Sequence, residues 1–271
     1  MRTETLTDRS ARLDLDGIDF EQFRSSPLDP ATLRCLRYMH DVEGHTACYL
    51  RDLLVTRAHR DAAITAFLAC WSYEEHWHGE AIARVLAAHG EPGGAARLVP
   101  LRTSLGWRDS IRPVLFAGLS AVCPQLPAVH MAWGAVNEWT TQAGYARLAA
   151  RAGNPVLTLL LRRIMRQEGR HIDFYSSTAR ELLGASRVAR RVTRAALQRF
   201  WGPVGSGVMP QAEVRFLATH LFGDRDGLEA AQRVDRQIDR LPGLSGLHLL
   251  EKAVSDLAPT ARAGGPAALA A

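Results

Sequence analysis

Apolar positions recur every three to four residues over long stretches of this chain, which is the pattern of helices rather than strands. Four stretches are bounded by capping signals, such as Asp29-Pro30 and Asn154-Pro155 at the start and Gly90 and Gly153 at the end. Each is longer than the average helix of about 11 to 12 residues. The chain is therefore predicted to be all-α, with four long helices at residues 30–57, 61–89, 127–153 and 155–184.

The connections between these helices predict how they pack. The first two meet near His59 and the last two at Gly153, in turns short enough to require antiparallel neighbours. Residues 91–126 are longer than a bundle turn needs, and residues 107–122 are predicted to form a helix of their own. Two hairpins joined by one long crossover form a ferritin-like four-helix bundle.

The rest of the chain is interpreted as additions to this bundle. The N-terminal segment is polar and predicts an arm that lies on the body or is loosely ordered. Helical patterns resume after Gly184 and are interrupted at Pro242-Gly243, and the last residues are small, apolar and rich in Gly and Pro. We predict an arm, a bundle, a C-terminal helical extension and a disordered tail, at residues 1–29, 30–184, 185–257 and 258–271.

Two Glu-x-x-His motifs lie in the second and fourth predicted helices. They are Glu75 with His78, and Glu168 with His171. Side chains three residues apart project from one face of a helix, so each pair can reach the same cavity. Glu-x-x-His also occurs by chance as an ordinary polar pair on a helix, so the position of the motifs within the hairpins has to decide their meaning.

Four glutamates lie at matching distances from the two predicted turns. Glu43 is 16 residues before His59 and Glu75 is 16 residues after it. Glu138 and Glu168 are each 15 residues from Gly153. Because a helix rises about 1.5 Å per residue, each pair lies at one height on its hairpin. The four carboxylates are therefore predicted to meet at one level of the bundle.

This set of side chains suits two metal ions. Four carboxylates neutralise two divalent cations, two imidazoles complete the ligands, and open positions remain for dioxygen; iron is expected, with manganese possible at either position. The alternative is a set of solvated helix residues, but the surrounding segments are apolar and unpaired core carboxylates would cost several kcal/mol each. The predicted metal ligands are Glu43, Glu75, His78, Glu138, Glu168 and His171.

The motifs resemble those of a known family. Residues 71–79, Trp-Ser-Tyr-Glu-Glu-His-Trp-His-Gly, resemble the Trp-x-x-Glu-Glu-x-x-His-Gly helix of soluble acyl-acyl-carrier-protein desaturases. Glu168-Gly169-Arg170-His171 is similar to the Glu-x-Arg-His of their last ligand helix. Glu138 followed by Thr141 matches their third ligand helix, in which the threonine lies beside the oxygen site, and Glu43 fits their first ligand.

The resemblance covers roughly residues 30–183. It implies a dioxygen-dependent di-iron oxidase that takes electrons from a ferredoxin-type donor and removes hydrogens from an acyl chain on an acyl carrier protein. Thr141 is the implied residue near the oxygen site. The sequence departs from the family at Gln167, where the desaturases carry an Asp, and this leaves the reaction open. Bacterioferritins and ribonucleotide reductase small subunits share the ligand set.

Three functional hypotheses follow. The leading one is a di-iron oxidoreductase, desaturase-like or oxygenase-like, acting on a hydrophobic substrate, and a monomer or homodimer would fit it. The second is a ferritin-type iron-oxidising or storage protein, although the residues after Gly184 exceed what a cage subunit needs. The third is a metal-free helical interaction module. Trp71, Tyr145 and Tyr175 lie one or two turns from ligands and are interpreted mainly as core packing, with bracing of the site or electron relay as alternatives.

Charge and composition narrow the partners. The net charge of +5 favours acidic partners but is too small to indicate nucleic acid. Helical spacing places four arginines on one face that could dock an acidic carrier protein or be solvated, namely Arg187, Arg190, Arg191 and Arg194. Residues 224–227, Asp-Arg-Asp-Gly, lack the other ligands of a calcium loop and are interpreted as a turn.

The expected location is the cytoplasm. The N-terminus lacks the order of a secretory signal, and no stretch approaches the roughly 20 apolar residues of a transmembrane helix. The four cysteines have no Cys-x-x-Cys spacing, so a disulfide framework is not expected.

Overall fold

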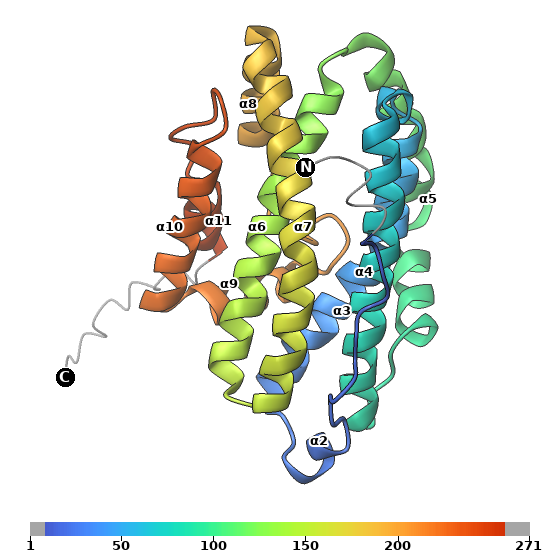
Figure 1. The fold of residues 1–271 in the computed structure, drawn as a ribbon, viewed down its shortest axis with the longest axis vertical. Helices are drawn as coiled ribbons and strands as arrows, with labels where there is room; N and C mark the ends of the chain where they lie inside the picture. The colour runs from blue at the N-terminus through green and yellow to red at the C-terminus, as the bar shows by residue number, and fades with distance from the viewer. Residues whose placement is uncertain (1–8, 258–271) are drawn as a thin grey trace, which may run out of the picture.

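The computed structural model describes residues 9–257 (Figure 1). Within that range the chain forms no β-strand. Its regular elements are helices throughout, which confirms the prediction of an all-α fold. None of the described helices combines the length and apolar character that a bilayer crossing requires.

The four predicted long helices are present. They begin where the capping residues predict, because the side chains of Asp29, Asp61 and Asn154 accept hydrogen bonds from backbone N–H groups of the first turns. Gly153 ends the third helix with a φ of 59°, a left-handed conformation that glycine adopts at little steric cost. The helices are α3 Pro30–Leu54, α4 Ala62–Ala88, α6 Leu126–Ala152 and α7 Pro155–Ala185.

The first connection is longer than the sequence predicts. Helix α3 ends at Leu54 rather than near Arg57, and a 3₁₀ turn, η1 Arg57–Arg60, completes the junction with α4. The cause is Thr56, whose hydroxyl donates to the Leu53 carbonyl at 2.7 Å and accepts from the Ala58 N–H at 3.2 Å. One side chain thus closes the end of one helix and opens the next turn.

The crossover is more helical than predicted. Helix α5, Ala95–Val122, contains the expected helix at residues 107–122 and a preceding segment. The two parts meet at a kink at Gly106, whose φ of 61° departs from helical geometry. Helix α5 packs on the outside of α3, at the right of Figure 1, and brings the chain from the end of the first hairpin to the start of the second.

The long helices pack as two hairpins, α3 with α4 and α6 with α7. Contacts of α4 with α7 and of α3 with α6 join the hairpins around a common core. Fully buried side chains such as Phe67, Ile82, Leu157 and Tyr145 come from three of these helices. The stabilisation from burying such large side chains fixes the relative height of the four helices.

Four further helices follow, namely α8 Arg187–Phe200, α9 Gln211–Phe222, α10 Arg225–Asp239 and α11 Leu249–Leu257. Helices α8, α9 and α10 pack against α6, and α11 packs against α9 and α10. The buried Arg147 of α6 joins α6 to the end of α9 and the start of α10, donating to the Leu221 carbonyl at 3.0 Å and to the Asp224 carboxylate at 2.6 Å. Asp224 in turn accepts from the Gly227 N–H at 2.7 Å. The interpretation of residues 224–227 as a turn is therefore wrong, because Asp224 caps α10.

The N-terminal arm contains a short helix, α2 Gln22–Ser25. The residues before it run along the front of the molecule between α4 and α7 (Figure 1). The first eight residues of the predicted arm and the tail at 258–271, which was predicted to be disordered, lie outside the described residues.

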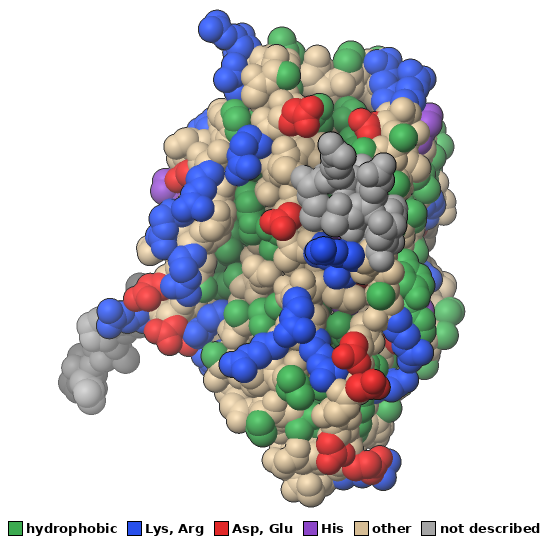
Figure 2. Space-filling view, in the orientation of Figure 1, with side chains coloured by type: hydrophobic (Ala, Val, Ile, Leu, Met, Phe, Trp, Pro, Cys, Tyr) green, Lys and Arg blue, Asp and Glu red, His purple; other side chains and the backbone are tan. Residues whose placement is uncertain are grey.

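The arginines on the predicted basic face of α8 differ in their exposure. Arg187 and Arg191 are exposed, whereas Arg194 donates to the carbonyls of Gly243 and Ser245 at 3.2 and 2.8 Å and is half-buried. Basic side chains also gather over α10, at the left of Figure 2, where exposed arginines include Arg233. Positive charge is therefore spread over several helices, and docking of an acidic carrier on α8 remains a prediction.

The Arg147 contact gives a stability test. We expect Arg147→Ala to lower the free energy of unfolding by about 2 kcal/mol, because the Leu221 carbonyl and the Asp224 carboxylate lose a charged donor. Arg151 reaches the same carboxylate from a more exposed position, so Arg151→Ala should cost less than about 1 kcal/mol. Urea unfolding followed by circular dichroism measures both. Equal losses for the two variants would contradict this assignment.

Candidate metal centre

The six side chains predicted as metal ligands lie together inside the bundle. Each is buried, with at most 6% of the residue exposed. They form two groups whose ligand atoms lie within 4.8 Å of one another, and each group could hold a metal ion. The first group is Glu43, Glu75, His78 and Glu168, and the second is Glu75, Glu138, Glu168 and His171. Glu75 and Glu168 belong to both groups, so the two positions are adjacent.

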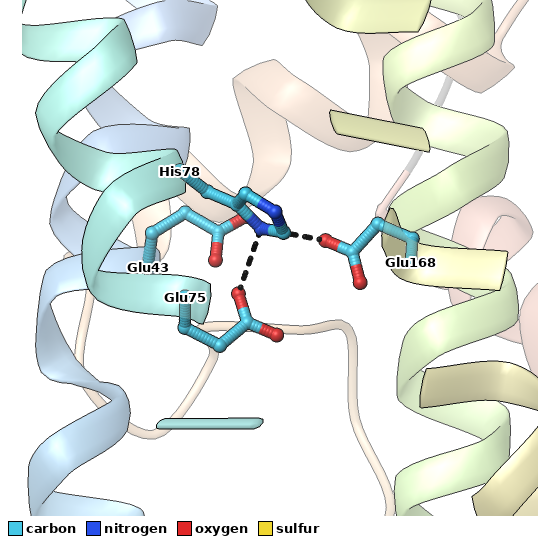
Figure 3. Close-up of side chains that lie close together, drawn as sticks. All are labelled: Glu43, Glu75, His78 and Glu168. Atoms are coloured by element: carbon cyan, nitrogen blue, oxygen red, sulfur yellow. Dashed lines mark ion pairs between the residues drawn. The ribbon is translucent and has the colours of Figure 1, made fainter. Parts of the chain in front are cut away.

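Each Glu-x-x-His motif turns both of its side chains inward. His78 Nδ1 lies 3.4 Å from Glu75 and 3.3 Å from Glu168, as Figure 3 shows. His171 Nδ1 lies 3.3 Å from Glu75 and 2.8 Å from Glu168. Both imidazoles therefore present the same nitrogen to the carboxylates, as the i, i+3 spacing on facing helices α4 and α7 predicts.

The other nitrogen of each imidazole points outward to a hydrogen-bond acceptor. His78 Nε2 lies 2.9 Å from Gln167 Oε1, and His171 Nε2 lies 2.8 Å from Glu74 Oε2. Because these oxygens accept, Nε2 carries a proton in each ring, and Nδ1, facing the cluster, is the nitrogen that would bind a cation once it gives up its own proton. Sequence reasoning missed this role of Glu74. Its signal was the Glu74-Glu75 pair, in which neighbouring carboxylates on a helix face different partners.

Two aromatic side chains brace the remaining carboxylates. The Tyr145 hydroxyl donates to Glu43, and Trp71 Nε1 donates to Glu138 Oε1 at 2.9 Å. Burial and the adjacent Glu43 charge raise the pKa of Tyr145 well above its usual value, so the phenol keeps its proton. The main interpretation of these residues as core packing is therefore incomplete, because both orient ligand-type side chains. Tyr175 packs edge-on against Trp71, with ring centroids 5.9 Å apart.

The four carboxylates of the cluster carry more negative charge than its two imidazoles can balance. Burial and the Glu75 charge raise the pKa of Glu43 well above its usual value, and burial with Glu168 does the same for Glu138. Burial alone would lower the pKa of His78, but the carboxylates of Glu168 and Glu75, 3.3 and 3.4 Å from Nδ1, raise it to about 9. Protons therefore collect on these side chains when no other cation compensates the carboxylates.

Unpartnered lone pairs test whether metal ions fit here. Glu75 Oε2, His78 Nδ1 and Glu168 Oε1 are buried and make no hydrogen bond. A buried acceptor without a donor costs about 1 to 3 kcal/mol, and a cation between these three atoms would satisfy them together. Carboxylate-rich sets with imidazole suit iron and manganese. The residues present therefore fit the metal ions that the sequence predicts.

A cavity of about 470 Å³ opens onto Glu43, Glu75 and Glu138. Its walls are mainly apolar, with Phe116 and Trp133 among them. Other elements that line it include α3, α5, α6, α8 and the loop at residues 202–207. A mainly apolar cavity of this size with a few polar groups in its lining is typical of a site for a hydrophobic small molecule.

Thr141 and Gly134 shape the cavity where it meets the carboxylates. Thr141 lines the cavity one turn after Glu138 on α6, in the position that the sequence predicts for it. A Cβ atom at Gly134 would overlap the ring of Tyr175, so the absence of a side chain there lets Tyr175 pack across α6. Gly134 and Tyr175 both line the cavity.

Comparison with known proteins assigns no family to this chain. No protein-family model matches it, and no curated protein sequence matches it. The interpretation of the cluster as a metal centre therefore depends on the burial, spacing and unpartnered atoms of its own side chains.

The raised pKa values predict proton release on metal binding. In the cation-free protein, Glu43, Glu138 and His78 keep their protons to a higher pH than the same side chains do in water, because their pKa values are raised. A divalent cation binds the deprotonated forms, so its apparent affinity should rise with pH by about tenfold per pH unit for each proton displaced. Calorimetric titration with Mn²⁺ in two buffers of different ionisation enthalpy counts these protons. Binding without proton release would show that the carboxylates are already charged.

Proposed function

We propose that this protein is a ferritin-like di-iron oxidoreductase that uses dioxygen to oxidise a hydrophobic substrate. The observation that carries the proposal is the meeting of four carboxylates and two imidazoles with an apolar cavity at one buried point. Glu43 and His78 would hold one iron ion, Glu138 and His171 the other, with Glu75 and Glu168 reaching both. Two iron ions so held supply the chemistry of dioxygen activation.

Connectivity and motifs support this class. Two helical hairpins joined by the long α5 crossover agree with the ferritin-like arrangement, in which a Glu from each of two helices joins two Glu-x-x-His motifs. The resemblance of residues 71–79 to the acyl-acyl-carrier-protein desaturases favours an acyl chain as the substrate, presented on an acyl carrier protein. The two electrons that such a reaction needs would come from a ferredoxin-type donor.

The protein's own groups would perform three tasks. The apolar walls, including Phe116 and Trp133, bind and orient the chain and exclude water from the centre. Tyr145 and Trp71 hold the Glu43 and Glu138 carboxylates in place. The hydroxyl of Thr141, which lines the cavity one turn after Glu138, can hold or pass a proton at its Oγ atom.

The cavity also favours this function over iron storage. Hydrated iron ions moving to a mineral core need a polar path, whereas the cavity at the centre is mainly apolar. Helices α8, α9 and α10 pack against α6 and add material that a minimal cage subunit lacks. Native mass separates the two functions, because a large hollow assembly would support storage and a monomer or dimer the enzyme.

Metal content and product analysis test the proposal together. Purified full-length protein given Fe²⁺ should retain about two iron ions per chain. Glu75→Ala should reduce this to below one, because Glu75 belongs to both groups, whereas Glu181→Ala at an exposed position of α7 should change nothing. With dioxygen, a ferredoxin and its reductase, acyl thioesters on a carrier protein should lose two hydrogens or gain one oxygen by mass spectrometry. Absence of stoichiometric metal in the wild type would refute the proposal.

Thr141 provides a test of the cavity end of the site. We expect Thr141→Val, which keeps the side-chain shape and removes the hydroxyl, to lower product formation by about tenfold or more. Iron content should stay at the wild-type level, because Thr141 belongs to neither ligand group. Unchanged turnover in this variant would remove the hydroxyl from the mechanism.

A further inference from the structure

The outward-facing nitrogens of the two imidazoles donate hydrogen bonds to chemically different groups. His171 Nε2 donates to the carboxylate of Glu74, which also accepts from Arg170 at 2.6 Å. His78 Nε2 donates to the neutral carboxamide of Gln167. Gln167 is the position at which the sequence departs from the desaturase pattern. A carboxylate partner makes an imidazole a stronger metal ligand than a neutral amide does.

A single residue of the N-terminal segment, Ala11, contacts both Gln167 and Glu74. Gln167 Nε2 donates to the Ala11 carbonyl at 3.0 Å, and the Ala11 N–H donates to Glu74 Oε1 at 3.4 Å. An amide side chain has one accepting end and one donating end. The contact with the Ala11 carbonyl therefore fixes the amide so that its oxygen faces His78. An Asp at position 167 could not make this pair of bonds, because a carboxylate has no donor.

Residues 9–16, which we name the strap, are held on the bundle by contacts away from the centre. Arg163 donates to the Asp14 carbonyl at 2.8 Å and to the Asp16 carbonyl at 2.6 Å. The guanidinium of Arg12 lies 4.1 Å from the ring centroid of Trp77. Leu13 is buried between these anchors. The strap is thus fixed one turn from Gln167 on α7 and one residue from His78 on α4.

We propose that the strap is a positioning element of the metal centre, whose two positions are unequal because a carboxylate supports one imidazole and a neutral amide the other. By holding the Ala11 carbonyl against Gln167, it keeps the amide oxygen on His78. The position at His171, backed by Glu74, binds a divalent cation first, and the position at His78, backed by the amide, binds second and more weakly. This inference rests on the proposed di-metal centre and assigns the order in which that centre fills.

Stepwise Co²⁺ titration of the metal-free, full-length protein tests the proposal, with visible absorption and metal analysis as readouts. The wild type should bind two Co²⁺ ions in steps that differ at least tenfold in affinity. Arg163→Ala releases the strap without touching a ligand. It should weaken the second step about tenfold or more and the first step much less, because Glu74 loses only the Ala11 contact and keeps its bond from Arg170. Arg162→Ala, an exposed neighbour on α7, is the matched control and should leave both steps unchanged.

A rescue variant separates positioning from general support of the fold. Both oxygens of a carboxylate accept, so Gln167→Glu does not need the strap to select an orientation. The double variant Arg163→Ala/Gln167→Glu should therefore recover the second step. Glu74→Gln should weaken the first step instead, because it gives His171 a neutral partner.

The possible outcomes test the strap proposal and the di-metal proposal separately. A wild type that binds no stoichiometric Co²⁺ would refute the proposed di-metal function. Two equal steps in the wild type, or two steps that Arg163→Ala leaves unchanged, would overturn the strap proposal while the di-metal centre stands. Equal weakening of both steps by Arg163→Ala without rescue by Gln167→Glu would show a purely structural strap and would also overturn it.

Discussion

Four carboxylates buried at one level of a helical bundle impose the constraint on which the rest of this structure depends. Glu43, Glu75, Glu138 and Glu168 are all nearly inaccessible to water, so their charge has to be balanced inside the protein. Protons, the two imidazoles or metal ions can supply the balance. The raised pKa of His78 and the unpartnered atoms of Glu75 and Glu168 show that hydrogen bonds alone do not balance the charge of the carboxylates.

The surrounding residues are organised around this charge. Tyr145 and Trp71 each give one hydrogen bond to a carboxylate and fill the core with their rings. Glu74 and Gln167 fix the two imidazoles from outside, and Arg170 compensates the charge of Glu74. Each of these contacts joins different helices, so the packing of the bundle and the geometry of the centre depend on each other.

The apolar cavity and the strap lie on different sides of this centre. The cavity meets the carboxylates, and its size and walls suit a hydrophobic chain. The strap meets the residues behind the imidazoles through Ala11. The proposed chemistry would therefore take place at the carboxylate side, while the histidine side is closed by polar contacts that hold the ligands in place.

The sequence by itself determined the helices and the level of the candidate ligands. Helix caps such as Asp29, Asp61 and Asn154 act on backbone groups within one turn, so local residues suffice to locate the helix starts. The matching distances of the glutamates from the turns follow from the constant rise of a helix. Local rules did not predict the early end of α3 at Leu54 or the extent of α5. These depend on the hydrogen bonds of the Thr56 hydroxyl and on the non-helical backbone of Gly106.

Only the tertiary structure decided which residues support the ligands. The bond between Gln167 and Ala11 spans 156 positions, and the bond between Tyr145 and Glu43 spans 102. The attachment of α9 and α10 to α6 depends on Arg147, which lies 77 positions from Asp224. The cavity likewise needs walls from several separate helices. Such partners are chosen by the packing of whole helices, which acts between segments far apart in the chain and leaves no periodic signal within either one.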